Sequence, residues 1–434
     1  MLWFASHSRH RIRPTGCGLA VGLAFCWVVH SFCYSIGAAQ QTPTAQHVRS
    51  ASGVVGQAKK LIQDGNPQGA LALLKQADLR GSNASDIHTL KGISFAMLAK
   101  PIESTAEFDQ AIALRPDYAP IYLSSGLAAA NFDNLSRASE MLSNALRLDP
   151  TLPGLRYNYA LVLARTAQYA ESEKQADIEL AGKRPGRETP VELWKLKARD
   201  AYYQKKWQDT IDSCNKVLEF QPDWAEAFAA IGEALFFLNR SQQSETALRK
   251  ALALDPEDEA AHQILARLYQ DDGREDESIP EFETAIRLRP TDKEAIYRLF
   301  RIYSKKGDAA NAARLQKQLK DTIASNMAES MNQAKGTALN NKGMELEKEG
   351  DFAGALDAYD QAAKADMDNI IYQRNAALLL CKMGRTQEAI RRLRDILSLD
   401  SDDAETLQIL AVANELASGN IQEKKSLPRP QSSH

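Results

Sequence analysis

Residues 225–258 read AEAFAAIGEALFFLNRSQQSETALRKALALDPED, and a similar pattern recurs along most of this 434-residue chain. The stretch contains two runs of helix-forming residues separated by a short polar segment. It closes near a proline, a residue that cannot continue a helix. Prolines are spaced by 34 residues between Pro116 and Pro150, between Pro222 and Pro256, and between Pro256 and Pro290. A fixed period of this length indicates a repeated pair of helices that must stack on its neighbours to bury its apolar side.

The residue types within the period resemble the tetratricopeptide repeat family. That signature combines a large residue early in the first helix, small residues where the helices cross, and a proline after the second helix. In residues 225–258 the signature positions hold Phe228, Gly232, Ser244, Leu248, Ala251 and Pro256. Two antiparallel helices approach closely only where side chains are small, so we expect Gly232 and Ala251 at the crossing. The resemblance implies an all-α fold, an α-α superhelix built as a right-handed solenoid of helix-turn-helix repeats.

The repeat pattern also predicts the domain organisation. An array of about eight repeats, two of them degenerate, is expected at 51–326, and two further repeats are expected at 336–403. The repeat at 293–326 lacks its terminal proline and continues into a polar stretch, which predicts a linker at 327–335. A capping helix is expected at 404–417, with Leu407, Leu410 and Ala411 on its buried side, and a polar, disordered tail at 418–434.

The N-terminus has the features of a targeting segment. Three arginines at positions 9, 11 and 13 precede an apolar run from Cys17 to Val29, and Gly37-Ala38-Ala39 supplies small residues suited to signal peptidase. These features predict a signal peptide at 1–39, a linker at 40–50 and an exported protein, periplasmic or extracellular. The alternative is an uncleaved membrane anchor, and contact with a membrane is expected only if this segment is retained.

Composition and motifs exclude several classes of function. The formal net charge is −3, whereas nucleic-acid binding normally requires a basic face, so we expect no nucleic-acid partner. The sequence lacks a Cys-x-x-Cys pair, a His-Glu-x-x-His helix and a glycine-rich phosphate loop, so we expect no metal, no cofactor and no enzymatic activity. His88 and His262 each stand where the repeat packs a large side chain, and we interpret both as structural.

The inner surface of the solenoid is the expected binding site. In proteins of this family the first helix of each repeat lines a concave groove, and partners are proteins or peptides. The inward positions combine cations with aromatic side chains, which are common anchors at protein interfaces. The candidate groove residues are Tyr157, Asn158, Arg165, Lys195, Arg199, Tyr202, Phe236, Arg267, Tyr297 and Arg301. Under the alternative interpretation the aromatic residues pack against adjacent helices and the cations pair with Glu192, Glu226 or Glu233.

The sequence therefore predicts an exported scaffold that acts as an adaptor in a cell-envelope process. Two alternatives remain open: a structural subunit of an envelope assembly machine, and a regulatory arm of an enzyme complex such as a protein glycosyltransferase. Repeats attached to glycosylating enzymes carry an asparagine at one position of successive repeats. Here only Asn158, Asn341 and Asn375 occupy that position, so the ladder is broken.

Overall fold

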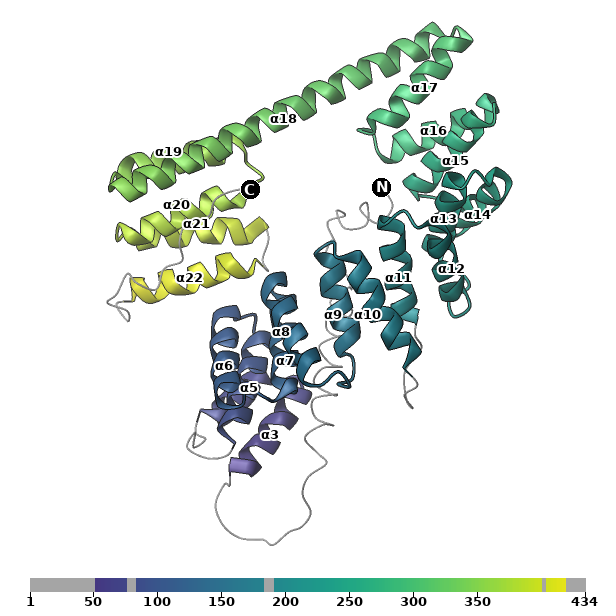
Figure 1. Cartoon of the computed structure of the whole chain (residues 1–434). Helices are drawn as coiled ribbons and strands as arrows, with labels where there is room; N and C mark the ends of the chain where they lie inside the picture. Colours follow the sequence, from purple (N-terminus) through teal and green to yellow (C-terminus); the bar gives the residue numbers. More distant parts are fainter. Residues whose placement is uncertain (1–50, 76–82, 183–190, 400–402, 419–434) are drawn as a thin grey trace. The chain divides into compact units, whose positions relative to one another are not determined.

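The computed structural model describes residues 51–75, 83–182, 191–399 and 403–418, and within these ranges every regular element is an α-helix (Figure 1). The prediction of an all-α repeat fold is confirmed. The chain divides into two units, Met1–Lys306 (unit 1) and Gly307–His434 (unit 2). The predicted signal peptide, the linker at 40–50 and nearly all of the predicted tail lie outside the described residues. Across the described ranges, no helix is both long and apolar enough to cross a lipid bilayer.

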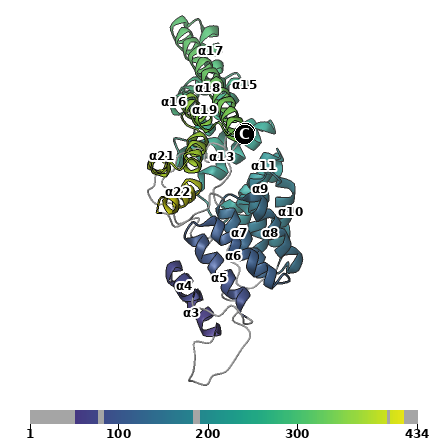
Figure 2. The same cartoon turned by 90° about the vertical axis from the view of Figure 1, so that its left-hand side faces the viewer.

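Unit 1 is a row of helical hairpins that follows the expected period. The first helices are α3 (Ala51–Gln63), α5 (Ala84–Met97), α7 (Ala119–Asn131), α9 (Leu155–Arg165), α11 (Val191–Tyr203), α13 (Ala225–Phe237), α15 (Glu259–Asp271) and α17 (Lys293–Lys306). The second helices are α4 (Pro67–Leu74), α6 (Pro101–Leu114), α8 (Leu135–Leu148), α10 (Tyr169–Ala181), α12 (Trp207–Leu218), α14 (Ser241–Leu254) and α16 (Glu275–Leu288). Each second helix packs on its own first helix and on the next one, as α4 does on α3 and α5 (Figure 2).

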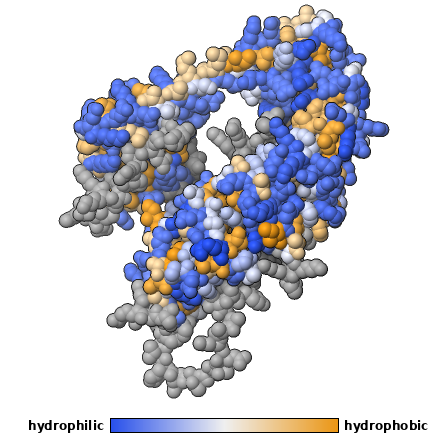
Figure 3. Space-filling model, viewed as in Figure 1, coloured by the Kyte–Doolittle hydropathy of each residue, from blue (hydrophilic) through white to orange (hydrophobic). Residues whose placement is uncertain are grey.

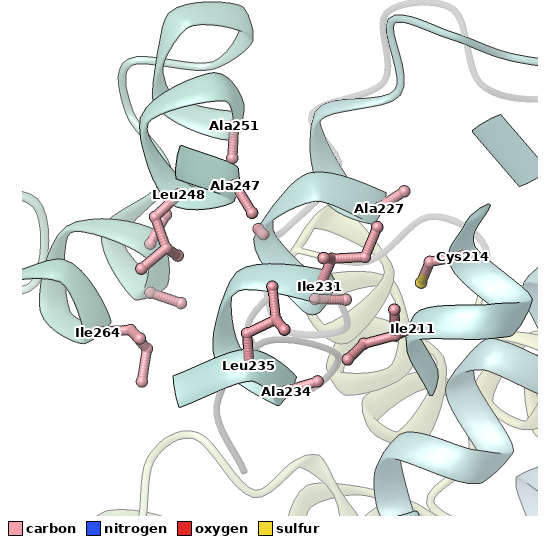
Figure 4. Packing of buried hydrophobic residues seen from close by; sticks show 14 of the residues in the cluster. Ile211, Cys214, Ala227, Ile231, Ala234, Leu235, Ala247, Leu248, Ala251 and Ile264 are labelled. Atoms are coloured by element: carbon pink, nitrogen blue, oxygen red, sulfur yellow. The ribbon is translucent and has the colours of Figure 1, made fainter. Parts of the chain in front are cut away.

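The helices of a hairpin approach most closely at the small residues that the sequence pattern identified. A Cβ atom added to Gly232 would lie 2.6 Å from the Cγ atom of Leu248, so no larger residue fits there without a shift. Leu248 and Ala251 are fully buried in a cluster that runs from α11 to α15, part of which is shown in Figure 4. Ser244 also donates a hydrogen bond from its hydroxyl to the carbonyl of Gly232, 2.7 Å away. Ser244 therefore both leaves room for the close approach and provides a hydrogen bond to the buried Gly232 carbonyl.

The turn between the two helices of a hairpin has one conformation throughout the described repeats. Its residue at repeat position 15 has a positive φ of 53° to 86° in each case. Glycine occupies this place at Gly65, Gly273, Gly307, Gly350 and Gly384, and other residues occupy it at Ala99, Asp133, Ala167, Lys205 and Asn239. The left-handed region is unfavourable for residues with a Cβ atom, so the second group stores strain that packing of the hairpin must overcome.

Unit 2 begins with a helix that corrects the predicted linker. Its helices are α18 (Ala309–Glu349), α19 (Phe352–Ala365), α20 (Ile370–Lys382), α21 (Thr386–Leu399) and α22 (Ala404–Ala417). Residues 327–335 lie inside the 41-residue α18, so the prediction of a separate linker there is wrong. The repeat period would place the terminal proline at position 324, where the chain has alanine. Without the proline, the second helix of one repeat continues into the first helix of the next.

The last helix, α22, occupies the predicted capping segment but is rotated relative to the prediction. It packs on α20 and α21 through Thr406, Ile409 and Ala413, which are fully buried. Leu407 and Ala411 are exposed, and Leu410 is only partly buried. The residues predicted to face the core precede or follow the buried ones by one or two positions. On a helix, a shift of one residue turns the buried face by about 100°.

Candidate functional site: the first-helix face of unit 1

Consecutive first helices of unit 1 contact one another through side chains on one side of the unit, which we call the first-helix face. It is formed by α9, α11, α13, α15 and α17 (Figure 1). Arg267 of α15 joins two of its neighbours. Its guanidinium carbon lies 5.0 Å from the ring centroid of Phe236 in α13, and its Nε atom lies 3.8 Å from Glu294 in α17. The candidate residues Phe236 and Arg267 therefore share one surface.

Tyr202 is a packing residue, which corrects its assignment to the ligand-binding surface. Its side chain is only 2% exposed and belongs to the buried cluster of α11 to α15. The phenol donates a hydrogen bond to Glu233 of α13 over 2.7 Å. Burial raises the pKa of Glu233, while this hydrogen bond and Arg267 act in the opposite direction. Tyr202 thus holds a buried carboxylate in place and links two first helices.

Tyr157 and Lys195 lie around the acidic side chain of Glu192. The Nζ atom of Lys195 is 3.0 Å from a Glu192 oxygen and 5.1 Å from the ring centroid of Trp224. Burial raises the pKa of Tyr157 to about 12, with a further increase from Glu192 and an opposing effect of Arg199. Lys195 therefore pairs within the protein, as the alternative interpretation of the sequence expected for some of the cations.

Arg199 has hydrogen-bond donors that are not used within the described residues. Its Nε and Nη2 atoms are buried and have no acceptor there. The nearest carboxylate is that of Asp200, 3.6 Å from Nε and beyond hydrogen-bonding range. Asp200 is itself fully buried, and burial raises its pKa to about 6 although Ser172 and Arg199 lower it. A buried donor without a hydrogen-bond acceptor is costly, and Arg199 has two such donors beside its ion pair with Asp200, the most of any candidate residue in the part of the chain described.

The other four candidates lie at the ends of the face or bond locally. Asn158 donates to the carbonyl of Gly154, the residue that precedes its own helix α9, over 2.8 Å. Arg165 donates to the carbonyl of Ala130 and pairs with Asp133 in the previous repeat. These contacts do not bring either residue to Arg199 or Arg267. Tyr297 and Arg301 are exposed on α17, with the guanidinium carbon 6.0 Å from the ring centroid.

Two stacked aromatic pairs beside the face were missed in the sequence. Tyr169 stacks on Tyr203 with centroids 5.1 Å apart, and Trp207 stacks on Phe237 at 4.6 Å. In each pair the first residue starts a second helix and its partner ends the first helix of the following repeat. The signal was present in the period, because Tyr169 and Trp207 share one repeat position and Tyr203 and Phe237 share another. These stacks join successive hairpins through ring contact.

The two histidines interpreted as structural make the same contact in different repeats. Nδ1 of His88 lies 2.5 Å from Glu107, and Nδ1 of His262 lies 2.5 Å from Glu281. Each pair joins the first and second helix of one hairpin. No group of three or more histidine, cysteine or acidic side chains suited to a metal ion occurs within the described ranges.

Comparison with known proteins finds one family model and several relatives that match part of the chain. A family model described as Psidin, N-terminal TPR repeats region, matches residues 199–327. Cellulose synthase operon protein C of Escherichia coli (strain K12) is 29% identical over 188 residues, which cover 42% of this chain and 15% of that protein. Superkiller protein 3 of Schizosaccharomyces pombe is 23% identical over 227 residues, or 49% of this chain and 16% of that protein. The chain therefore spans only a small part of the length of these relatives.

Two solved structures match part of the chain at low sequence identity. YrrB, described as a TPR protein with an unusual peptide-binding site, is 18% identical with a TM-score of 0.38, covering 44% of this chain and 96% of that chain. The C-terminal part of a TPR repeat-containing protein from Cytophaga hutchinsonii is 16% identical with a TM-score of 0.46, covering 56% of this chain and 98% of that chain.

Proposed function

We propose that this chain, which is a tetratricopeptide repeat protein and a scaffold for binding other proteins, acts as an exported adaptor in a cell-envelope process. Partner segments would bind to the first-helix face of unit 1. The observation that carries this proposal is the pair of arginines on that face, Arg199 and Arg267, whose buried donor atoms have no acceptor within the described residues. An incoming acceptor, met by a turn of these partly exposed side chains, would remove the cost of leaving those donors unsatisfied.

The composition of the face supports preference for acidic segments that also carry apolar side chains. Phe236 is partly buried and Phe237 is 38% exposed, so both can lose further surface to a ligand. Arg199 and Arg267 attract carboxylates, and their interactions with internal acids are longer than hydrogen bonds. Lys195 contributes less, because Glu192 already pairs with it at 3.0 Å.

Capture of partners by the purified full chain tests the proposal. We expect the double variant Arg199→Gln with Arg267→Gln to lose proteins that the wild type retains from an envelope extract, as quantified by mass spectrometry. The matched control changes Arg147 and Arg287, exposed arginines on the second helices α8 and α16, to glutamine. Equal capture by wild type and the Arg199/Arg267 variant would exclude binding on this face.

Export and the lack of catalysis form part of the same proposal. The basic, apolar and small-residue segments at the N-terminus support secretion with cleavage after Ala39. Mass spectrometry of the mature chain should find an N-terminus at Gln40, whereas an N-terminus within the first few residues would indicate a retained anchor. We further propose that the chain binds no nucleic acid and has no cofactor or catalytic site. Any activity of a complex would then belong to a partner, as in the regulatory-arm alternative.

A second candidate function is a structural subunit of an envelope assembly. Ile323, Met327 and Met331 are 42%, 66% and 71% exposed, and their spacing of four residues places them on one side of α18. Hydrophobic residues are visible along this helix in Figure 3. Light scattering after size exclusion separates the candidates, because an adaptor is expected to be monomeric alone and an assembly subunit to self-associate.

A further inference from the structure

Arg199 and Arg267 occupy the same place in repeats that are two periods apart. Both stand at position 9 of the repeat, in the middle of the first helices α11 and α15. The corresponding residue of the repeat between them is Glu233 of α13. Position 9 of these three successive repeats therefore holds a partly exposed cation, a buried acid and a partly exposed cation. This order deepens the proposed function, on which the following inference rests.

The unsatisfied atoms of Arg199 define the chemistry of the group that would bind there. Nε and the adjacent terminal nitrogen form one edge of a guanidinium, and this edge holds a carboxylate through two parallel hydrogen bonds. In Arg199 these are the two nitrogens without an acceptor within the described part of the chain. Asp200 does not fill the role, because consecutive residues of a helix point in different directions and cannot align face to face.

Arg267 also has an unsatisfied donor in the described part of the chain, but only one of its nitrogens is affected, compared with two in Arg199. Its Nε atom is buried and lacks a hydrogen-bond acceptor within the described ranges, and Glu294 lies 3.8 Å away. The Arg267 side chain remains 21% exposed, compared with 28% for Arg199, so part of each side chain faces solvent although the unpaired donor atoms are buried. Each arginine can bind one carboxylate from outside by turning its side chain so that the buried donors face the ligand.

Glu233, which lies between the two arginines in the repeat order, disfavours an acidic ligand residue. Its side chain is buried, with the Tyr202 hydroxyl 2.7 Å from one oxygen. A ligand carboxylate placed over Glu233 would meet a like charge in a region of low dielectric, where repulsion is strong. An apolar, aromatic or basic residue avoids this repulsion, and the neighbouring Phe236 and Phe237 offer it ring surface.

We propose that the ligand is an extended peptide segment with two acidic side chains about six residues apart and a non-acidic residue between them. Packed helices lie about 8–10 Å apart, so two repeat steps span about 20 Å. An extended chain advances about 3.3 Å per residue, which gives a separation of about six residues. A helical ligand advances about 1.5 Å per residue and would need a separation of about thirteen.

Selection from a random peptide library tests this spacing of the two acidic residues. A display library of sixteen random residues is panned on the full chain at physiological salt, and the enriched sequences are compared with those from the Arg199→Gln/Arg267→Gln variant. We expect wild type alone to enrich acidic pairs at separations of five to seven residues, with acids depleted midway. Enrichment at about thirteen residues, or of acids without a preferred separation, would overturn the inference.

Single variants link the two acids to their arginines. For a synthetic enriched peptide, Arg267→Gln should weaken binding about tenfold or more, which corresponds to one lost charged hydrogen-bonded contact. Arg147→Gln should change it by less than about twofold, as expected for a distant exposed charge. Panning on Glu233→Gln should relax the depletion of acids at the central position. Unchanged central depletion would contradict the role given to Glu233.

The result also separates this inference from the proposed function. Peptides that depend on Arg199 and Arg267 but lack the paired spacing would retain the first-helix face as the binding site and exclude the spacing rule. Peptides that bind the double variant as well as wild type would exclude both.

Discussion

Replacing Gly232 with alanine tests how closely the two helices of one repeat approach. The added Cβ atom would lie 2.6 Å from Cγ and 2.7 Å from Cδ2 of Leu248, and 3.3 Å from the Leu248 backbone nitrogen. Carbon atoms in ordinary contact are about 3.5–4.0 Å apart, so the overlap is about 1 Å. Because the Leu248 backbone also lies close, rotation of the side chain does not remove the conflict.

The change in stability caused by Gly232→Ala is the sum of two opposing effects. Overpacking of a buried site costs about 1–3 kcal/mol, and replacing glycine with alanine inside a helix stabilises by about 1 kcal/mol. Gly56 provides the control, because it lies inside α3 and a Cβ atom added there meets nothing within 4 Å. Gly56→Ala should therefore stabilise the protein, whereas Gly232→Ala should leave it about 1–3 kcal/mol less stable than that control variant.

Amide hydrogen exchange of α13 and α14 is a suitable assay, because it reports local stability within a repeat array. Leu248→Ala removes the side chain that the new methyl group meets. In that background, Gly232→Ala should lose most of its penalty, giving a coupling free energy of about 1–3 kcal/mol, and only the closer contact with the backbone nitrogen of residue 248 remains. If Gly232→Ala stabilised the hairpin as much as Gly56→Ala stabilises its own, the helices would not be in the contact described.

Three further predictions follow from other parts of the structure. Asp200→Asn should flatten the pH dependence of the free energy of unfolding, measured by urea titrations. Folding raises the pKa of Asp200 from 3.8 to about 6, so the wild type is most stable below pH 4 and loses stability as the pH rises. The loss should reach about 3 kcal/mol by pH 7. At the left-handed turn residue, Ala167→Gly should stabilise the protein by about 1 kcal/mol, and Gly273→Ala should destabilise it by a similar amount. A lower melting temperature for Ala167→Gly, or a higher one for Gly273→Ala, would contradict the strain at this residue. Ala324→Pro should interrupt α18, costing about 3 kcal/mol and releasing amide protection around residues 320–324, and unchanged protection would argue against a continuous helix.

The candidate site was only partly predictable from the sequence. The period placed Lys195, Arg199 and Arg267 in first helices, because a residue's position within a regular hairpin sets which way it points. It could not show that Tyr202 is buried against Glu233, since an aromatic residue near the end of a first helix can face either the core or the surface. The pairing partners depend on contacts between residues about thirty positions apart in the sequence, and no local pattern encodes them.

The sequence by itself determined the helices, their pairing and the crossing points. These features depend on residue size, on the placement of proline and on a pattern that recurs within every repeat. Only the tertiary structure decided that α18 is continuous, that Ser244 bonds the opposite helix, and that Arg199 keeps donors unused among the described residues. The physical reason is that a helix forms from interactions between near neighbours in the chain. Burial and hydrogen-bond partners arise from residues of different repeats that meet only after folding.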